Sequence, residues 1–198
     1  MRRMNTSPVD AVRWWQDNVG PVAPVGHVLR RFLAERWIRF HSLPDSKRYA
    51  ETSDEYAELV RRHLTITNDL FVAGEEIFIF CSDCLDSETG RADPQQVLDA
   101  TLSEELVKLP ANPGVVIPED DDHYRVRASV TLWQPGFFED IVQAVADEKV
   151  WGLCFASPGS SSVYCPYDGG MDVFVSPERC IGIATKFSHW KSGRQDGL

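Results

Sequence analysis

The amino-acid sequence predicts one α+β domain over residues 1–198, in which a mixed sheet ends in a three-stranded antiparallel meander and carries amphipathic helices. Six strand candidates are interleaved with helical segments, in a chain of ordinary globular composition with 43% hydrophobic and 25% charged residues. The last three strand candidates are joined by tight turns, which place neighbouring strands antiparallel. A doubly wound nucleotide fold has no support, because no G-x-G-x-x-G or P-loop spacing follows a strand candidate.

The N-terminal quarter predicts two helices followed by a strand. Ser7 is suited to cap the first helix, Pro8 fits its first position, and Gly20-Pro21 ends it. Residues 28–34 form a second short helix. Residues 37–49 then read as a strand that runs into a polar, basic loop, because Pro44 prevents a helix there.

The clearest amphipathic helix follows this loop. It begins at a capping box formed by Thr52 and Glu55, and Gly74 stops it. Glu76 to Cys81 is a continuous apolar run without alternation, which predicts a strand that is covered on both faces.

Residues 83–122 stand apart from the rest of the chain in their charge. They contain eleven acidic and two basic residues, so this segment has a net charge of −9 out of the total of −10. A helix start is indicated at Asp93, and Pro110, Pro113 and Pro118 break regular structure beyond it. We therefore expect an acidic helix and loop excursion outside the core sheet.

The C-terminal third has the most regular pattern. Residues 124–133 alternate between apolar and polar, which predicts a strand with one solvated face, and a helix starts at Pro135. The meander is predicted at residues 150–156, 162–166 and 171–175. A last helix starts at Ser176 and presents one apolar face: Cys180, Ile183, Ala184, Phe187 and Trp190.

Charge and cysteine content limit the function classes. The net charge of −10 argues against nucleic acid or an anionic membrane as the main partner. No apolar run is long enough to cross a bilayer, and no apolar stretch follows the basic first residues, so we expect a cytoplasmic protein. Five cysteines in that setting are expected to be reduced thiols.

Three smaller motifs favour structural interpretations. Cys81 and Cys84 form a lone C-x-x-C without the further ligands of a zinc site or the electropositive setting of a redox pair. Glu119 to His123 lacks the spacing and the glycine of a calcium loop, so a solvated turn is expected. His63 lies on the apolar face of its helix, which predicts a buried histidine that is satisfied by one backbone or carboxylate partner. We accordingly assign no metal, no cofactor and no catalytic residue.

One constellation remains as a candidate site. Four groups of the basic loop are combined with two acids near the C-terminal hairpin: Arg39, His41, Lys47, Arg48, Asp168 and Asp172. In the functional interpretation, the basic groups hold a phosphate or carboxylate and His41 exchanges a proton. In the structural interpretation, the arginines pair with the two aspartates and attach the loop to the hairpin.

Four sequence blocks resemble an uncharacterised bacterial protein family. They are Arg39-Phe-His-Ser-Leu-Pro-Asp-Ser-Lys-Arg-Tyr49, Glu58 to His63, Pro166-Tyr-Asp-Gly-Gly-Met-Asp172, and Trp190, Ser192 and Gly197-Leu198 at the C-terminus. Leu64 and Lys191 depart from the pattern. The resemblance implies a bacterial protein with a shared fold, and it implies no activity.

Two function classes follow from these features. The first is a protein-interaction module of the toxin-neutralising, immunity type, which meets a basic partner through the acidic segment and especially Glu119, Asp120, Asp121 and Asp122. The alternative is a binding protein or enzyme for a small anionic ligand at residues 39–48, with a pocket between this loop and the Asp168 turn. The sequence leaves catalysis and oligomeric state open.

Overall fold

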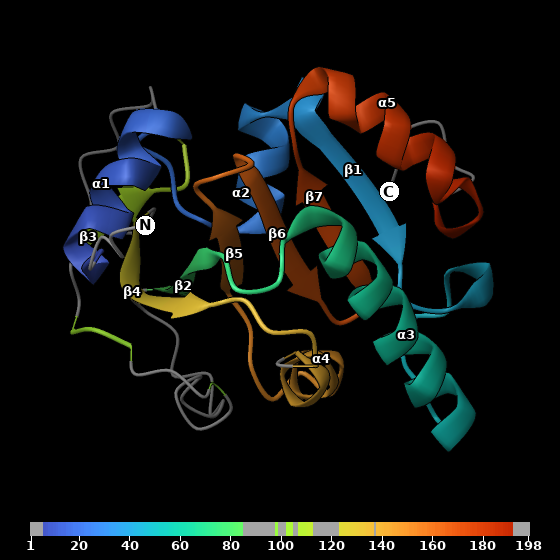
Figure 1. Cartoon of the computed structure of the whole chain (residues 1–198). Helices are drawn as coiled ribbons and strands as arrows, with labels where there is room; N and C mark the ends of the chain where they lie inside the picture. Colours follow the sequence, from blue (N-terminus) through green and yellow to red (C-terminus); the bar gives the residue numbers. More distant parts are fainter. Residues whose placement is uncertain are drawn as a thin grey trace.

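The structure is a computed structural model that describes residues 6–84, 98, 102–104, 107–112, 123–136 and 138–191. Within these residues, seven strands form a single antiparallel sheet in the order β1-β7-β6-β5-β2-β4-β3. Five α-helices pack against this sheet (Figure 1). The predicted α+β class and the C-terminal meander, formed by β5, β6 and β7, are confirmed.

The elements have the following bounds. The strands are β1 Trp37–His41, β2 Glu76–Cys84, β3 Val107–Pro110, β4 His123–Leu132, β5 Leu153–Ser157, β6 Ser162–Tyr167 and β7 Gly170–Phe174. The α-helices are α1 Pro8–Asn18, α2 Gly26–Phe32, α3 Ser53–Leu70, α4 Glu139–Ala146 and α5 Pro177–Lys186. Short 3-10 helices occupy Ala34–Arg36, Pro44–Ser46 and Ser188–Trp190.

The helix starts are set by local chemistry. Ser7 and Thr52 each complete the capping box at the start of α1 and α3, and the hydroxyl of Ser176 accepts from a backbone N–H of α5. The start of α2 differs from the prediction, since this helix begins at Gly26. Phe32 at its end remains 46% exposed.

The sheet has a hydrophobic core on each face. Side chains alternate along β2, so that Ile77 and Ile79 face the core beneath α3, α4 and α5, while Phe78 and Phe80 face the core beneath α1 and α2. The prediction of a strand buried on both faces is confirmed. In Figure 1, α3 crosses the front of the sheet, while α1 lies at the other end of the molecule from α5.

Long-range pairing places β1 at the edge of the meander. β1 runs antiparallel to β7, with Arg39 opposite Asp172 and His41 opposite Gly170. The backbone N–H of Ser42 then donates to the carbonyl of Gly169 at 3.1 Å. The loop that follows β1 therefore starts directly beside the turn that contains Asp168.

The acidic segment is more closely tied to the sheet than the sequence predicts. β2 continues to Cys84, and Val107–Pro110 forms the edge strand β3, paired with β4. Leu98 and Leu102 are buried in the core beneath α3 and α4. The prediction of an excursion outside the sheet is therefore wrong for β3, because a proline is tolerated at the end of an edge strand. The helix expected from Asp93 and the acidic run 119–122 lie outside the described residues.

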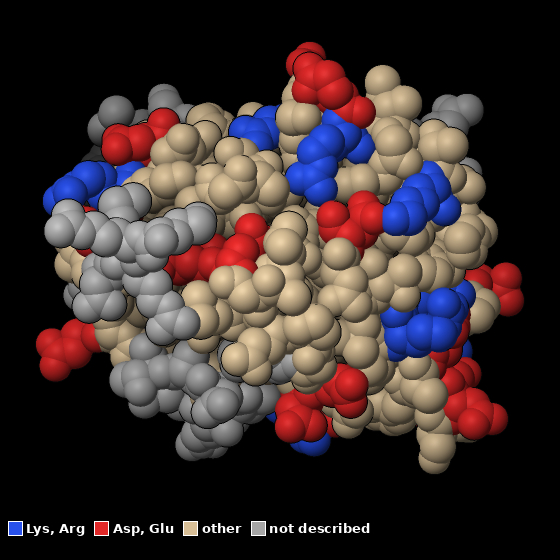
Figure 2. Space-filling view, in the orientation of Figure 1, with Lys and Arg blue, Asp and Glu red and all other residues tan. Residues whose placement is uncertain are grey.

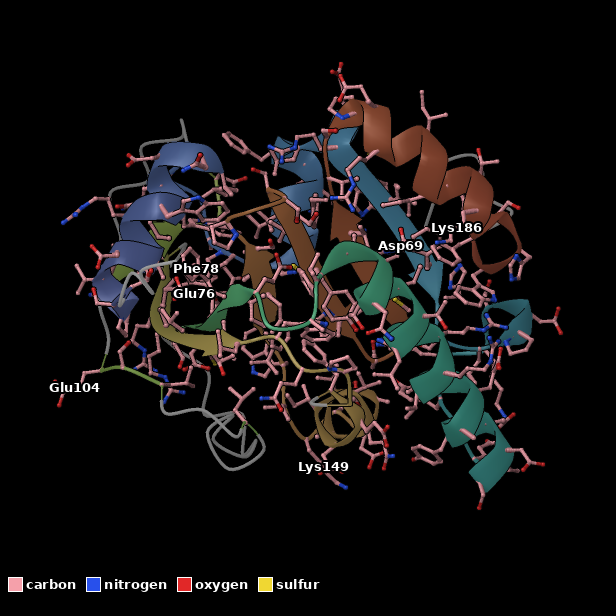
Figure 3. All side chains as sticks on the ribbon, viewed as in Figure 1. Asp69, Glu76, Phe78, Glu104, Lys149 and Lys186 are labelled. Carbon is pink, nitrogen blue, oxygen red and sulfur yellow. The ribbon has the colours of Figure 1, made fainter. Side chains whose placement is uncertain are left out.

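The C-terminal helix is joined to its neighbours by charge and by ring contacts. Lys186 of α5 pairs with Asp69 of α3, as the side-chain view shows (Figure 3). Trp190 stacks on Phe187 at 5.2 Å between ring centroids, and Lys191 forms a bridge to Phe40 on the outer edge of β1. Among the described helices, none is long and apolar enough to span a membrane.

Candidate ligand-binding site

The floor of the candidate site consists of two rows of residues across three strands. One row contains Arg39, Asp172 and Cys165, and the next contains His41, Gly170 and Tyr167. Arg39 and His41 are two positions apart on β1, so their side chains leave the same face of the sheet. This is the face covered by α1 and α2.

Arg39 and Asp172 form a buried, bidentate ion pair. Nε and Nη2 of Arg39 donate to the two oxygens of Asp172, each at 2.8 Å, and the indole N–H of Trp37 donates to the same carboxylate at 2.8 Å. Asp172 is 2% exposed, and the guanidinium lies 4.7 Å from the centre of the Tyr167 ring. Burial opposes the charge of Arg39, but the bond to Asp172 raises its pKa above the ordinary value.

A second pair closes the rim of the site. Arg48 donates to Asp168 at 2.6 Å, while its side chain remains 61% exposed. Both ion pairs of the structural interpretation are therefore present, and they attach the loop to the hairpin. Lys47 takes no part in them, because its ammonium bonds to Glu51 and Glu55 and it does not line the cavity.

A cavity of about 500 Å³ lies above this floor, a volume that is typical of small-molecule sites. Three segments form its walls: the start of α2, the loop after β1, and the connection between α4 and β5. Besides the floor residues, the lining consists of Val25, Gly26, His27, Ser46, Arg48, Val145, Glu148, Val150, Trp151, Gly152, Leu153, Pro166, Asp168 and Gly169. The structure thus brings together all the predicted ligand-binding residues except Lys47.

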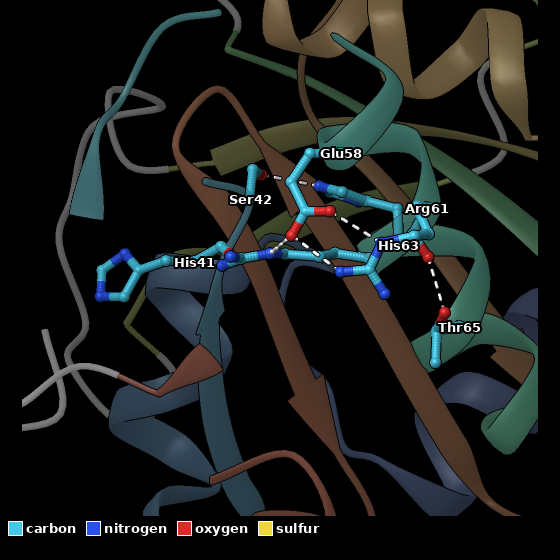
Figure 4. A network of polar contacts seen from close by, with 7 residues as sticks. His41, Ser42, Glu58, Arg61, His63 and Thr65 are labelled. Carbon is cyan, nitrogen blue, oxygen red and sulfur yellow. Dashed lines mark hydrogen bonds and ion pairs between the residues drawn. The ribbon is translucent and has the colours of Figure 1, made fainter. Parts of the chain in front are cut away.

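His41 is the least satisfied polar group of this site. Its ring turns away from Glu58 and Arg61 (Figure 4), while its backbone carbonyl accepts from Arg62 at 3.2 Å. The ring Nε2 is buried and has no hydrogen-bond partner among the described residues. Burial and the positive charges of Arg39 and Arg62 lower the pKa of His41, so its imidazole is neutral at pH 7.

The second histidine of the pocket, His27, is also held neutral. Burial lowers its pKa, and so do the charges of Arg30 and Arg31 on the same helix. Its Nε2 lies 3.3 Å from the hydroxyl of Tyr124, which connects the start of α2 to β4. The pocket therefore presents two neutral imidazoles, each close to cationic side chains.

A comparison with family models identifies the domain. The model described as "Domain of unknown function (DUF3885)" matches residues 25–195. The chain belongs to this family. The matched region contains every residue that lines the cavity, whereas α1 precedes it. Searches of curated proteins and of solved structures found no match.

His63 belongs to the core of the DUF3885 domain and not to its cavity. It bridges two buried hydroxyls, with Nε2 2.7 Å from Ser42 Oγ and Nδ1 2.5 Å from Tyr164 Oη (Figure 4 shows the Ser42 contact). Burial lowers the pKa of His63 to about 3. The predicted buried histidine is confirmed, with hydroxyl partners in place of one backbone or carboxylate group. Ser42 is fully buried and does not line the cavity. The hydrogen bonds from Ser42 through His63 to Tyr164 therefore have a structural role, in which they connect the end of β1 to α3 and β6.

Two glycines allow the walls to close on the floor. A Cβ atom on Gly26 would lie 2.8 Å from Oδ2 of Asp172 and 3.2 Å from Cβ of Cys165. A Cβ atom on Gly170 would lie 2.8 Å from the hydroxyl of Tyr167 and would overlap the backbone of β1. The start of α2 and the ring of Tyr167 approach the sheet this closely only because these positions lack side chains.

The sequence motifs with structural interpretations do not contribute to the pocket. Cys81 faces the opposite core, and the side chain of Cys84 and residues 119–122 lie outside the described residues. Cys165 lines the cavity, but burial raises the pKa of its thiol, which makes it a poor nucleophile. In the part of the chain that the structure describes, no three His, Cys, Asp or Glu side chains are grouped to hold a metal ion.

Sequence reasoning missed the walls of the cavity. His27, Glu148 and Trp151 come from segments that are distant in sequence from the basic loop, and no local pattern links them to it. Tyr167 could have been found, because it precedes Asp168 in the block that contains the hairpin turn. Tyr167 also lies two residues after Cys165 on the same strand, so the two side chains are on the same face of the sheet.

Proposed function

We propose that this DUF3885 domain binds a small anionic ligand in the cavity above β1, β7 and β6. The observation that carries the proposal is the convergence of Arg39, His41 and Arg48 on a cavity of about 500 Å³. Most small-molecule sites combine an apolar lining with a few convergent polar groups, as this cavity does. The proposal concerns binding, and we assign no catalytic step to it.

Local electrostatics support an anion near the imidazoles. The charged groups that shift the pKa of His41 are Arg39 and Arg62, both of them cations. Arg30 and Arg31 lower the pKa of His27, and Asp172 opposes them. An anion beside Arg39 and His41 would lie close to these cations in a partly desolvated site, where charge interactions are stronger than in water.

Thermal stabilisation by a panel of carboxylated and phosphorylated metabolites tests this proposal, because a ligand at 100 times its Kd adds about 2.7 kcal/mol to folding stability. Arg48→Met should weaken the stabilisation, since Arg48 lines the cavity. Arg61→Met is the matched control. Arg61 is 56% exposed and paired with Glu58, as Arg48 is exposed and paired with Asp168, but it lies outside the cavity.

The proposal fails if no member of the panel raises the melting temperature of the wild-type domain. It also fails if Arg48→Met and Arg61→Met reduce the stabilisation equally, since that result would place the ligand elsewhere. Both variants remove an exposed arginine, so a general effect of charge on stability is shared between them.

The second candidate function is a protein interaction through the acidic segment. The charge of −9 within residues 83–122 supports it. On the face that Figure 2 shows, Lys and Arg side chains lie beside Asp and Glu over α3 and α5, where ion pairs such as Arg61–Glu58 and Lys186–Asp69 occur. Charges of both signs alternate on this surface, so it would not attract a basic partner strongly. The electrostatic attraction that speeds association would come from the acidic segment.

Replacing Glu119, Asp120, Asp121 and Asp122 by their amides tests the second candidate. A basic protein captured from the host cytoplasm at low salt should be lost with the amide variant, and its association rate should fall as salt is raised. Equal capture by both proteins contradicts the interaction.

A further inference from the structure

We infer that the ligand of this pocket is a carboxylic acid with an apolar body, and not a phosphate ester. Its carboxylate lies between Arg39 and His41, and its body packs against Trp151 and Tyr167. This inference rests on the proposed function and specifies its ligand class.

The charge balance of the lining separates the two anion classes. The lining contains two cations and three anions. Arg39 pairs with Asp172, and Arg48 pairs with Asp168 and also interacts electrostatically with Glu148. The fixed charges of the lining therefore amount to about −1. A phosphate dianion would add two negative charges to a partly buried site that has no spare cation, whereas a carboxylate adds one.

The donors for a carboxylate are present. A guanidinium has five N–H groups, and Arg39 gives one from Nε and one from Nη2 to Asp172. Its Nη1 has no acceptor among the described residues. The His41 ring stands two positions along the same strand face and also lines the cavity. One carboxylate between them would accept from Nη1 and from a protonated imidazole.

The body of the ligand is defined by the remaining lining. Six apolar or aromatic side chains dominate the walls, namely Val25, Val145, Val150, Trp151, Leu153 and Pro166. A cavity of about 500 Å³ holds a body larger than a single ring. An extended aromatic or branched aliphatic acid fits both the lining and the volume.

Protonation of His41 couples this binding to pH. The charged groups near the ring are Arg39 on β1 and Arg62 on α3, and the rim adds Arg48, Asp168 and Glu148. In the free protein, burial and the two arginines keep the pKa of His41 below its ordinary value. A bound carboxylate raises this pKa, so a proton is taken up and binding strengthens as pH falls towards the pKa of the free protein.

Isothermal titration calorimetry tests the inference with three ligands that share a naphthalene ring system: 1-naphthaleneacetate, its primary amide, and 1-naphthyl phosphate. We expect the acid to bind at least tenfold more tightly than the amide and than the phosphate at pH 7. Its affinity should rise severalfold from pH 8 to pH 6, and buffers of different ionisation enthalpy should reveal proton uptake.

Two variants locate the proton. His41→Gln should bind the acid with little dependence on pH, while His189→Gln, which removes an exposed histidine outside the cavity, should behave as the wild type. The melting temperature of each variant without ligand verifies that it is folded. Should His41→Gln not fold, the ring resonances of His41 in the wild type, followed by NMR against pH with and without the acid, report the same rise in its pKa.

The possible failures can be told apart. Tighter binding of the phosphate, or acid binding that is independent of pH, overturns this inference and leaves the proposed function intact. If none of the three ligands binds and only the phosphorylated members of the metabolite panel give stabilisation that depends on Arg48, the ligand class is again wrong. If neither ligand set has any effect, the proposed function itself fails.

Discussion

The two ion pairs of the site perform different tasks, although both join the basic loop to the hairpin. Arg39 is 14% exposed and lies between aromatic rings, and Asp172 accepts three hydrogen bonds. Arg48, in contrast, is mostly in solvent. The inner pair is part of the folded core, whereas the outer pair forms a rim that can change without affecting the core. A substitution at the rim can therefore change ligand binding with little effect on the fold, whereas a substitution in the inner pair should affect stability.

The largest effect is expected from Asp172→Ala. Removing one partner of a buried ion pair leaves an uncompensated charge, which costs about 3–5 kcal/mol of unfolding free energy. Asp168→Ala removes the outer partner and should cost less, about 1 kcal/mol, because Arg48, the charge that is left behind, is 61% exposed to solvent. Urea unfolding of both variants measures the difference. Equal losses would show that burial does not distinguish the two pairs.

The second effect concerns acid stability and compares His63 with His41. The pKa of His63 is about 3 in the folded protein and about 6.5 in the unfolded chain, so only the unfolded state binds the proton between these values. Stability should be constant above about pH 6.5 and fall by up to about 1.4 kcal/mol per pH unit below it. Urea unfolding at several pH values checks this slope. His41→Gln should keep most of this dependence of the unfolding free energy on pH. An unfolding free energy of the wild type that does not change below pH 6.5 would contradict the burial of His63.

The third effect tests how closely α2 approaches the inner pair. In Gly26→Ala the new methyl group would meet Asp172, which its three hydrogen bonds hold in place. Overpacking of this kind costs about 1–3 kcal/mol. Gly182→Ala is the control, since a Cβ atom there meets nothing within 4 Å. Thermal unfolding should separate the two variants, and the control should be neutral or stabilised, because alanine is the better helix former.

The smallest effect is expected at the rim. Arg48→Met and Arg61→Met should each change the unfolding free energy by less than about 1 kcal/mol, because each removes a largely exposed ion pair. Chemical denaturation of the free proteins measures this. A large loss in Arg48→Met alone would mean that the outer pair also supports the fold, and the contrast with Arg39 would then weaken.

Local features of the fold were predictable from the sequence. Hydrogen bonds within three or four residues define the starts of α1, α3 and α5, and short turns define the meander, so neither depends on distant segments. The acidic partners of Arg39 and Arg48 could be predicted for a related reason. The hairpin supplies Asp168 and Asp172 close to the basic loop once β1 pairs with β7.

Features that depend on distant segments were not predictable. No local pattern places the connection between α4 and β5 over the floor, so Glu148 and Trp151 were missed. Strand β3 was not predicted, because its two apolar positions, Val107 and Leu109, give a weak strand pattern among prolines and acidic residues. This strand is stabilised by its pairing with β4, which the local sequence does not indicate. The partners of His63 were predicted as the wrong type, because the hydroxyls of Ser42 and Tyr164 meet only in the assembled sheet.

The position of β1 at the edge of the meander has a consequence for folding kinetics. Arg39 and Asp172 are 133 residues apart in the chain, so closing this pair means closing a very long loop. Non-local pairing of this kind slows folding, and strand β7 is completed late in synthesis. We therefore expect helices and the strands of the meander to form before β1 docks, and the cavity to be the last part of the domain to form.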